Sequence, residues 1–302
     1  MILSMNTLSA EKNESIVKAL QQHVYMLADE IGERNVFRPD ALHDAERYIT
    51  QTWQTMGYEV QSQVYELNAV RSANLEVTVQ GSDKANEIIL IGAHYDSVRG
   101  SPGANDNGSG VSALLELSRL FVSSKPQRTI RFVAFVNEEP PFYYSSDMGS
   151  MHYAKAARQR DDDIRLMLSL ETMGYYRDEA KSQNYPPLFR YFYPDKGNFI
   201  AFVSNFGSRS KLKKLTKAFE GCSNFPAEHV STFSWVPGVN WSDHLSFWRT
   251  NYDALMVTDT AFYRYPYYHS YEDTADKLDY ERLAKVTKGL HCALSRLSKE
   301  SL

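Results

Sequence analysis

The stretch EIILIGAH, residues 87–94, is the part of the sequence that decides the fold. Apolar residues follow one another in it without polar alternation, which predicts a strand buried on both faces. Four further apolar runs predict strands, at residues 129–136, 164–170, 199–203 and 254–258. Helical patterns lie between and after them, at residues 108–120, 149–158, 210–219 and 280–297. This alternation predicts an α/β fold with a mixed, mainly parallel β-sheet sandwiched between helices.

The N-terminal part of the chain has a different pattern. Apolar residues at a 3.6-residue period predict two helices, over residues 16–31 and 41–56. Alternating residues over 58–67 and 75–79 then predict two strands with one solvated face. These strands are typical of a hairpin at the edge of a sheet.

The chain shows no clear domain boundary. Its longest irregular stretch, residues 172–198, contains three prolines but no boundary signal. We therefore expect one domain over residues 1–302, with the helices of residues 1–56 packed on it.

The composition excludes several classes of protein. Hydrophobic residues make up 43% and charged residues 23%, as in an ordinary globular protein. The net charge of −4 argues against nucleic acid as a partner. The sequence contains no run of 18 apolar residues, so no membrane span is predicted.

Residues 1–15 lack the pattern of a signal peptide, so we expect a cytoplasmic protein, or a periplasmic or secreted one if a leader has been removed. The sequence makes no prediction about oligomeric state.

The chain has two cysteines, Cys222 and Cys292. Two cysteines are too few for a disulfide framework, and neither lies in a CxxC motif. We therefore expect both to be small apolar side chains.

Acidic residues and histidines follow the predicted strands. His94, Asp96 and Asp106 come after the first buried strand, and Glu138-Glu139 after the second. Two more candidates are Glu171, at the end of the third strand, and His269, in the segment after the strand at 254–258. Because the carboxyl ends of parallel strands meet at one edge of a sheet, we expect these side chains to share one cleft.

Four carboxylates in one cleft would repel one another without a counter-charge. Two Zn²⁺ ions carry a charge of +4, which balances Asp106, Glu138, Glu139 and Glu171. Neutral imidazoles and carboxylates are ordinary zinc ligands. A shared carboxylate with room for a bridging water is typical of a two-metal site for hydrolysis. Asp96 is two residues beyond His94, a spacing that lets its carboxylate accept the other ring N–H.

Together these motifs resemble metallopeptidase family 28, which includes di-zinc aminopeptidases, some carboxypeptidases and glutaminyl cyclases. The segments are GAHYDS (92–97), PGANDNGSG (102–110), NEE (137–139), Glu171, WSDH (241–244) and HSYEDT (269–274). The resemblance implies one zinc bound by His94 and Glu171, another bound by Glu139 and His269, and Asp106 as the bridge. It also implies a single zinc-peptidase domain with an α/β sandwich.

The remaining roles follow from the same resemblance. Glu138 is implied as the general base, and Asp96 as a residue that supports the metal ligands from behind. The function expected is that of a zinc-dependent exopeptidase, an aminopeptidase that cleaves N-terminal residues from peptides through a metal-bridging water. The alternatives are a glutaminyl-peptide cyclotransferase with one zinc and a non-catalytic binding domain on the same fold.

Two features depart from the common family pattern. Glu171 stands where many members have Asp, and the segment 140–148 intervenes between the Glu pair and the next helix. Asp243 and His244 either shape the substrate site or cap a helix at residues 245–249. The aromatic stretch 262–271 either packs as a loop or lines an apolar pocket, which would favour large hydrophobic first residues.

Overall fold

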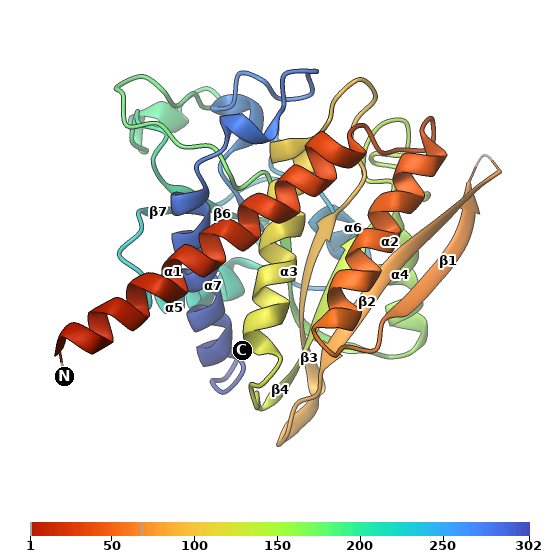
Figure 1. The fold of residues 1–302 in the computed structure, drawn as a ribbon, viewed down its shortest axis with the longest axis horizontal. Coiled ribbons are helices and arrows are strands. Elements are labelled where there is room, and N and C mark those ends of the chain that lie inside the picture. Colours follow the sequence, from red (N-terminus) through yellow and green to blue (C-terminus); the bar gives the residue numbers. More distant parts are fainter. Residues whose placement is uncertain (1, 68) are drawn as a thin grey trace.

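An eight-stranded sheet runs through the part of the chain that the structure describes, in the order β1-β2-β4-β3-β5-β8-β6-β7 (Figure 1). The structure is a computed structural model that describes residues 2–67 and 69–302, with side chains from residue 14 on. The strands are β1 (Gln61–Leu67), β2 (Val70–Val79), β3 (Lys84–His94), β4 (Arg128–Phe135), β5 (Asp163–Glu171), β6 (Ile200–Ser204), β7 (Ala227–Ser231) and β8 (Ala254–Thr258).

The centre of this sheet is parallel and its flanks are mixed. Strands β4, β3, β5 and β8 are parallel neighbours, whereas β1, β2 and β4 pair antiparallel. On the other flank β6 runs antiparallel to β8 and parallel to β7. The predicted mixed, mainly parallel sheet and the edge hairpin are therefore confirmed, and β7 is a strand that the sequence did not predict.

Strand β3 shows why the apolar run decides the fold. Ile89 and Ile91 belong to the large core on one face of the sheet, and Ile88 and Leu90 to a smaller core on the other. All four are buried. Because alternate residues of this apolar run are buried on opposite faces, the sheet needs other elements packed on both of its sides.

Seven helices of the described residues provide these covers. Helices α1, α2, α3, α5 and α7 pack on the face of the large core, and α4 and α6 pack on the other. Figure 1 shows α1 running across α3 and α7. The helices are α1 (Ile2–Tyr25, continued by a π-helical segment, Met26–Ile31), α2 (Pro39–Thr55), α3 (Gly110–Phe121), α4 (Gly149–Gln159), α5 (Arg209–Glu220), α6 (His244–Arg249) and α7 (Tyr280–Leu297).

The N-terminal helices share the main core. Ile16 and Leu20 of α1 and Ile49 and Trp53 of α2 are buried in the same cluster as the residues of β3 and α3. None of the helices described is long and apolar enough to cross a membrane.

The two cysteines form a disulfide, so the expectation of two separate apolar side chains is wrong. Cys222 follows α5, and Cys292 lies in α7, which packs against α5. Their Cα atoms are 5.9 Å apart, within the range that a disulfide spans. The sequence does not indicate this pairing, because the two cysteines are 70 positions apart in the chain.

Loss of this disulfide should lower the free energy of unfolding by about 2–4 kcal/mol, because it closes a long loop in the unfolded chain. Urea unfolding with and without a thiol reductant measures the effect. A double variant, Cys222→Ser with Cys292→Ser, is the control, and reductant should leave its midpoint unchanged. An equal midpoint for the oxidised and reduced wild-type protein would contradict the prediction.

Candidate metal centre and active site

The predicted site residues gather at the carboxyl edge of the parallel strands. The chain brings them there from five segments: the end of β3, the loop before α3, the loop after β4, the end of β5 and the loop between β8 and α7. In that order they are His94 with Asp96, Asp106, Glu138 with Glu139, Glu171 and His269. All except His269 are buried.

Asp106 lies between two pairs of side chains. Its Oδ1 is 3.3 Å from Nε2 of His94, which is 3.2 Å from Oε2 of Glu171. Its Oδ2 is 3.0 Å from Nε2 of His269, which is 3.4 Å from Oε2 of Glu139. The structure therefore brings together the two predicted pairs, with one carboxylate oxygen of Asp106 facing each.

The donor set fits a metal ion. Oδ1 of Asp106 and Oε1 of Glu139 are buried and accept no hydrogen bond from the described residues. Ligand atoms of His94, Asp106 and Glu139 all lie within 4.8 Å of one another. Imidazole and carboxylate are the ligands that zinc takes at catalytic sites. A buried oxygen without a donor is costly, and a bound cation would remove that cost.

The electrostatics of the cluster also call for positive charge. Burial raises the pKa of Glu139 well above its usual range, and the neighbouring Asp106 adds to the effect. Burial and Asp106 likewise raise the pKa of Glu171. Carboxylates in such surroundings are difficult to ionise together unless a cation lies between them.

Glu138 lies beside the cluster rather than within a pair. Its Oε2 is 3.9 Å from Nε2 of His94, and its carboxylate is 8% exposed. Burial raises the pKa of Glu138 well above its usual range. A carboxylate at this place can face a water or substrate at the cluster without belonging to either pair.

Asp96 holds the Glu pair through the backbone. Its two carboxylate oxygens accept hydrogen bonds from the backbone N–H groups of Glu138 (3.2 Å) and Glu139 (3.1 Å). Its Oδ1 lies 3.6 Å from Nδ1 of His94, whereas the backbone oxygen of Asp96 is 3.2 Å from that atom. The expected contact between the carboxylate and the ring is thus longer than a hydrogen bond, because the carboxylate is oriented by two N–H groups of the next loop.

Sequence reasoning missed the residues that hold the loop of Asp106. The carboxylate of Asp273 accepts hydrogen bonds from the backbone N–H groups of Asn105 (2.8 Å) and Asp106 (3.1 Å). Arg34, fully buried, donates to the carbonyl oxygens of Tyr95, Pro102 and Gly103 in the preceding segment. Asp273 lies in the quoted motif HSYEDT, so its place could have been suspected, but Arg34 carries no signal in the sequence.

The start of α3 lies close against β5, which brings Asp106 near Glu171. The Asn107 side chain donates to the carbonyl oxygen of Leu170 (2.7 Å) and accepts from the backbone N–H of Thr172 (3.1 Å). A Cβ added to Gly110 would lie 2.6 Å from the Leu170 oxygen. Only glycine allows this approach without movement of the sheet or the helix.

Ser242 supports Glu171, whereas Asp243 and His244 lie outside the two pairs. Ser242 Oγ donates to Oε2 of Glu171 at 2.7 Å. Asp243 precedes α6, but its side chain makes no capping hydrogen bond, so it is no conventional helix cap. Nε2 of His244 lies 2.8 Å from the backbone oxygen of Val239, and burial lowers the pKa of His244 to about 4. His244 therefore holds its own loop.

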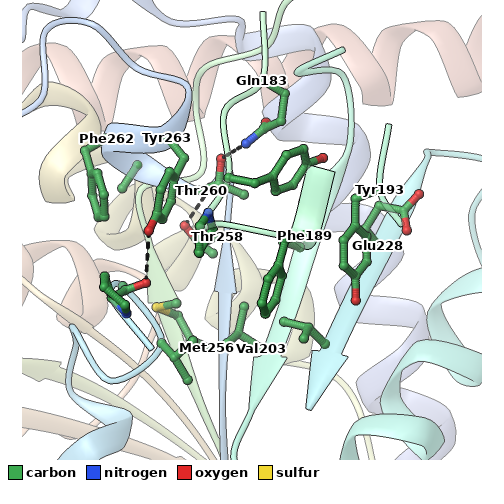
Figure 2. Close-up of a pocket in the computed structure, with 18 of the residues that line it drawn as sticks. Gln183, Phe189, Tyr193, Val203, Glu228, Met256, Thr258, Thr260, Phe262 and Tyr263 are labelled. Carbon is green, nitrogen blue, oxygen red and sulfur yellow. Dashed lines mark hydrogen bonds between the residues drawn. The ribbon is translucent and has the colours of Figure 1, made fainter. Parts of the chain in front are cut away.

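A largely apolar pocket, drawn in Figure 2, adjoins the cluster. Glu171 lines both the cavity and the metal cluster. Phe262, Tyr263 and Tyr268 of the aromatic stretch line the cavity, and the ring of Tyr268 stacks on His269 with 3.9 Å between centroids. This stretch is thus part of a pocket wall as well as a packed loop.

Comparison with known proteins places the chain among peptidases. The sequence pattern described as "Peptidase family M28" matches residues 74–293. The uncharacterised protein YfbL of Escherichia coli K12 is 34% identical over 95% of this chain and 90% of its own length. Aminopeptidase YwaD of Bacillus subtilis is 44% identical over 72% of this chain. That match covers 43% of YwaD, so the chain spans about half the length of the curated relatives named as aminopeptidases.

The fold is also similar to that of a solved structure. The structure described as BSAP, a zinc aminopeptidase from Bacillus subtilis, superposes with a TM-score of 0.74 over 94% of this chain and 96% of its own, at 16% identity. This likeness confirms the predicted α/β fold. Because the family pattern covers more than half of the residues, the chain belongs to Peptidase family M28, as its motifs indicated, and is a peptide hydrolase.

Proposed function

We propose that the protein is a zinc-dependent aminopeptidase that holds two zinc ions, one on each side of Asp106. The observation that carries this proposal is the placement of one carboxylate between two imidazole–carboxylate pairs, His94 with Glu171 and His269 with Glu139. The charge of two dications matches the four carboxylates gathered there. Relatives from Bacillus subtilis and Saccharomyces cerevisiae that are named as an aminopeptidase and a probable aminopeptidase support this activity.

The chain's own residues then have distinct tasks. Zinc ions at this site would polarise the scissile carbonyl and lower the pKa of a water to about 7. Glu138, beside the cluster, takes the proton of the attacking water and delivers it to the leaving amine. Asp96 fixes the backbone from which Glu138 and Glu139 project, by accepting hydrogen bonds from both of their backbone N–H groups.

Two features support action at a chain end. The cavity beside Glu171 can receive the side chain of the first residue. The segment 140–148 packs against the α6 region, where Tyr143 donates to the carbonyl oxygen of Asn240 and Arg249 to that of Tyr144. Tyr143 lies on the Glu138 side of the site, since burial raises the pKa of its phenol and the charge of Glu138 adds to the shift. In this position it leaves less room for any residue upstream of the first one.

A pair of peptides that differ only at the amine tests this proposal. We expect rapid release of the first residue from the free peptide and no cleavage of the N-acetylated one, because the free amine is the group that the zinc site recognises. Mass spectrometry of the products measures both. Equal cleavage of the two peptides would overturn the aminopeptidase assignment.

The same assay distinguishes the alternatives. A peptide that begins with glutamine would lose ammonia and keep its length in a glutaminyl cyclase, whereas an aminopeptidase releases glutamine. A non-catalytic binding domain would leave every peptide intact after zinc is supplied.

We propose that the protein works in an oxidising compartment, which corresponds to the periplasmic or secreted alternative. The Cys222–Cys292 disulfide supports this, since disulfides persist mainly outside the reducing cytosol.

A further inference from the structure

One acidic side chain lies in the apolar cavity away from the metal cluster. Two carboxylates line the cavity, Glu171 at the end of β5 and Glu228 in β7. Figure 2 shows Glu228 beside Tyr193, with Phe262 and Tyr263 across the cavity. Glu171 is accounted for by its contacts with His94 and Ser242, and Glu228 is not.

The sheet register fixes the distance between these two acids. Glu171 pairs with Thr258, Thr258 with Ala201, and Ala201 with Glu228, so the four form one row across β5, β8, β6 and β7. Paired residues point to the same face of a sheet. Adjacent strands are about 4.8 Å apart, so three steps place the Glu228 backbone roughly 14 Å from that of Glu171.

This spacing suits a long side chain. A peptide whose scissile bond lies at the metal cluster has its first Cα near Glu171, and its side chain would run along the row over Thr258 and Ala201. Small and apolar floor residues leave that course open, since Ala201 and Val203 of β6 line the cavity. A short side chain would stop before Glu228, whereas one with four or five atoms beyond Cβ approaches it.

The carboxylate of Glu228 has no donor of its own. No described residue donates a hydrogen bond to this carboxylate or forms an ion pair with it. The nearby phenol groups donate to other acceptors. The Tyr185 hydroxyl donates to the carbonyl oxygen of Pro194 (2.5 Å), and the Tyr193 hydroxyl to that of His229 (3.0 Å). Partial burial raises the pKa of Glu228, with His229 opposing and Glu220 adding to the shift. A half-buried acid without a partner favours a cationic ligand.

The walls around Glu228 fit the rest of such a ligand. Tyr193 stacks with Tyr185 at 5.8 Å and with Phe189 at 6.0 Å between ring centroids. Aromatic faces accept the apolar stem of lysine or arginine and attract its cationic end. The cation Arg264 forms no ion pair with Glu228: its Nε donates to Gln183 and its Nη1 to the carbonyl oxygens of Tyr175 and Phe199, while its Nη2 is buried without a hydrogen-bond partner among the described residues.

We propose that Glu228 makes the enzyme prefer peptides whose first residue is arginine or lysine. This inference rests on the proposed aminopeptidase function and adds the substrate class to it. It differs from the sequence expectation of a large hydrophobic first residue, because the walls of the cavity are apolar but its far side carries an unpaired acid.

Arginine and citrulline substrates provide the test, since they match in size and differ in charge. For the wild-type protein we expect kcat/KM for an arginyl-coumarin amide to exceed that for the citrullyl amide by about 10-fold, a modest value because Glu228 is only partly buried. Glu228→Gln should bring this ratio close to one, because the variant has no charge to distinguish arginine from citrulline. Glu220→Gln is the matched control, because it removes a neighbouring negative charge that does not line the cavity, and it should keep the ratio.

The outcomes separate this inference from the proposed function. Similar rates for arginine and citrulline in the wild-type protein, with Glu228→Gln unchanged, would overturn the role of Glu228 and leave the aminopeptidase standing. No hydrolysis of any amide would overturn the proposed function instead. In that case calorimetry with free L-arginine and L-citrulline still decides the pocket: binding of arginine that is lost in Glu228→Gln supports it, and equal binding of the two contradicts it.

Discussion

Replacing Glu138 with alanine should lower kcat by about 10²–10⁴-fold and leave the bound zinc unchanged, as expected for loss of a general base. Glu138 lies beside the cluster, 3.9 Å from the nearest imidazole nitrogen, and belongs to neither imidazole–carboxylate pair. The backbone N–H that Asp96 holds remains in the variant. The loop should therefore keep its place while the proton acceptor is lost.

Glu139→Ala is the matched variant, because the two residues are adjacent and both are held by Asp96. Glu139 lies 3.4 Å from Nε2 of His269, so its loss removes one ligand of the pair. We expect this variant to lose zinc as well as activity. Elemental analysis of both purified variants measures the difference, and equal zinc loss would show that the roles of the two acids are not separate.

The sequence predicted the parts of this molecule that depend on local patterns. The apolar run at 87–94 identified the central strand because every one of its faces is buried, and the spacing of Leu283, Val286, Leu290 and Leu294 identified α7. The candidate site residues were proposed because each lies at the end of a predicted strand or in the segment that follows one, at one edge of the sheet. The family, the fold class and the peptide-hydrolase activity are confirmed.

Features that depend on distant contacts were not predictable in the same way. Strand β7 reads AEHVS, a short and partly polar segment that is a strand only because β6 offers it an edge. Arg34 is fully buried because carbonyl oxygens from three separate segments surround its guanidinium, an arrangement that no local pattern encodes. The domain assignment and the individual roles of the site residues stay predictions.

The irregular stretch 172–198 illustrates how a correct prediction can miss a function. The sequence indicated irregular structure there. The only regular secondary structure in this segment is one short 3₁₀ turn at Phe189–Tyr191. Its side chains Tyr185, Phe189 and Tyr193 nevertheless form a wall of the cavity over β6 and β7. Loop residues often carry specificity in this way, because a rigid sheet positions them.

The position of Asp106 predicts how zinc content should change along a series of variants. One oxygen faces His94 and the other His269, so Asp106 would be a ligand to both ions. We expect two zinc ions in the wild-type protein, about one in His269→Ala, which removes a ligand from one side, and fewer than one in Asp106→Ala. Glu272→Ala is the control, since it removes an exposed acid from the loop of His269 and should keep both ions.

Stability should follow the same order, because ions that bind the folded chain alone stabilise it by mass action, about 2.7 kcal/mol per site at 100 times Kd. Thermal unfolding in the presence of zinc should therefore give the highest midpoint for wild type and Glu272→Ala, a lower one for His269→Ala and the lowest for Asp106→Ala. A chelator should bring the midpoint of wild type down by the largest amount and that of Asp106→Ala by the least. Should Asp106→Ala retain two ions, or His269→Ala lose both, the carboxylate would not be the shared ligand, and the two sides of the site would have to be held in another way.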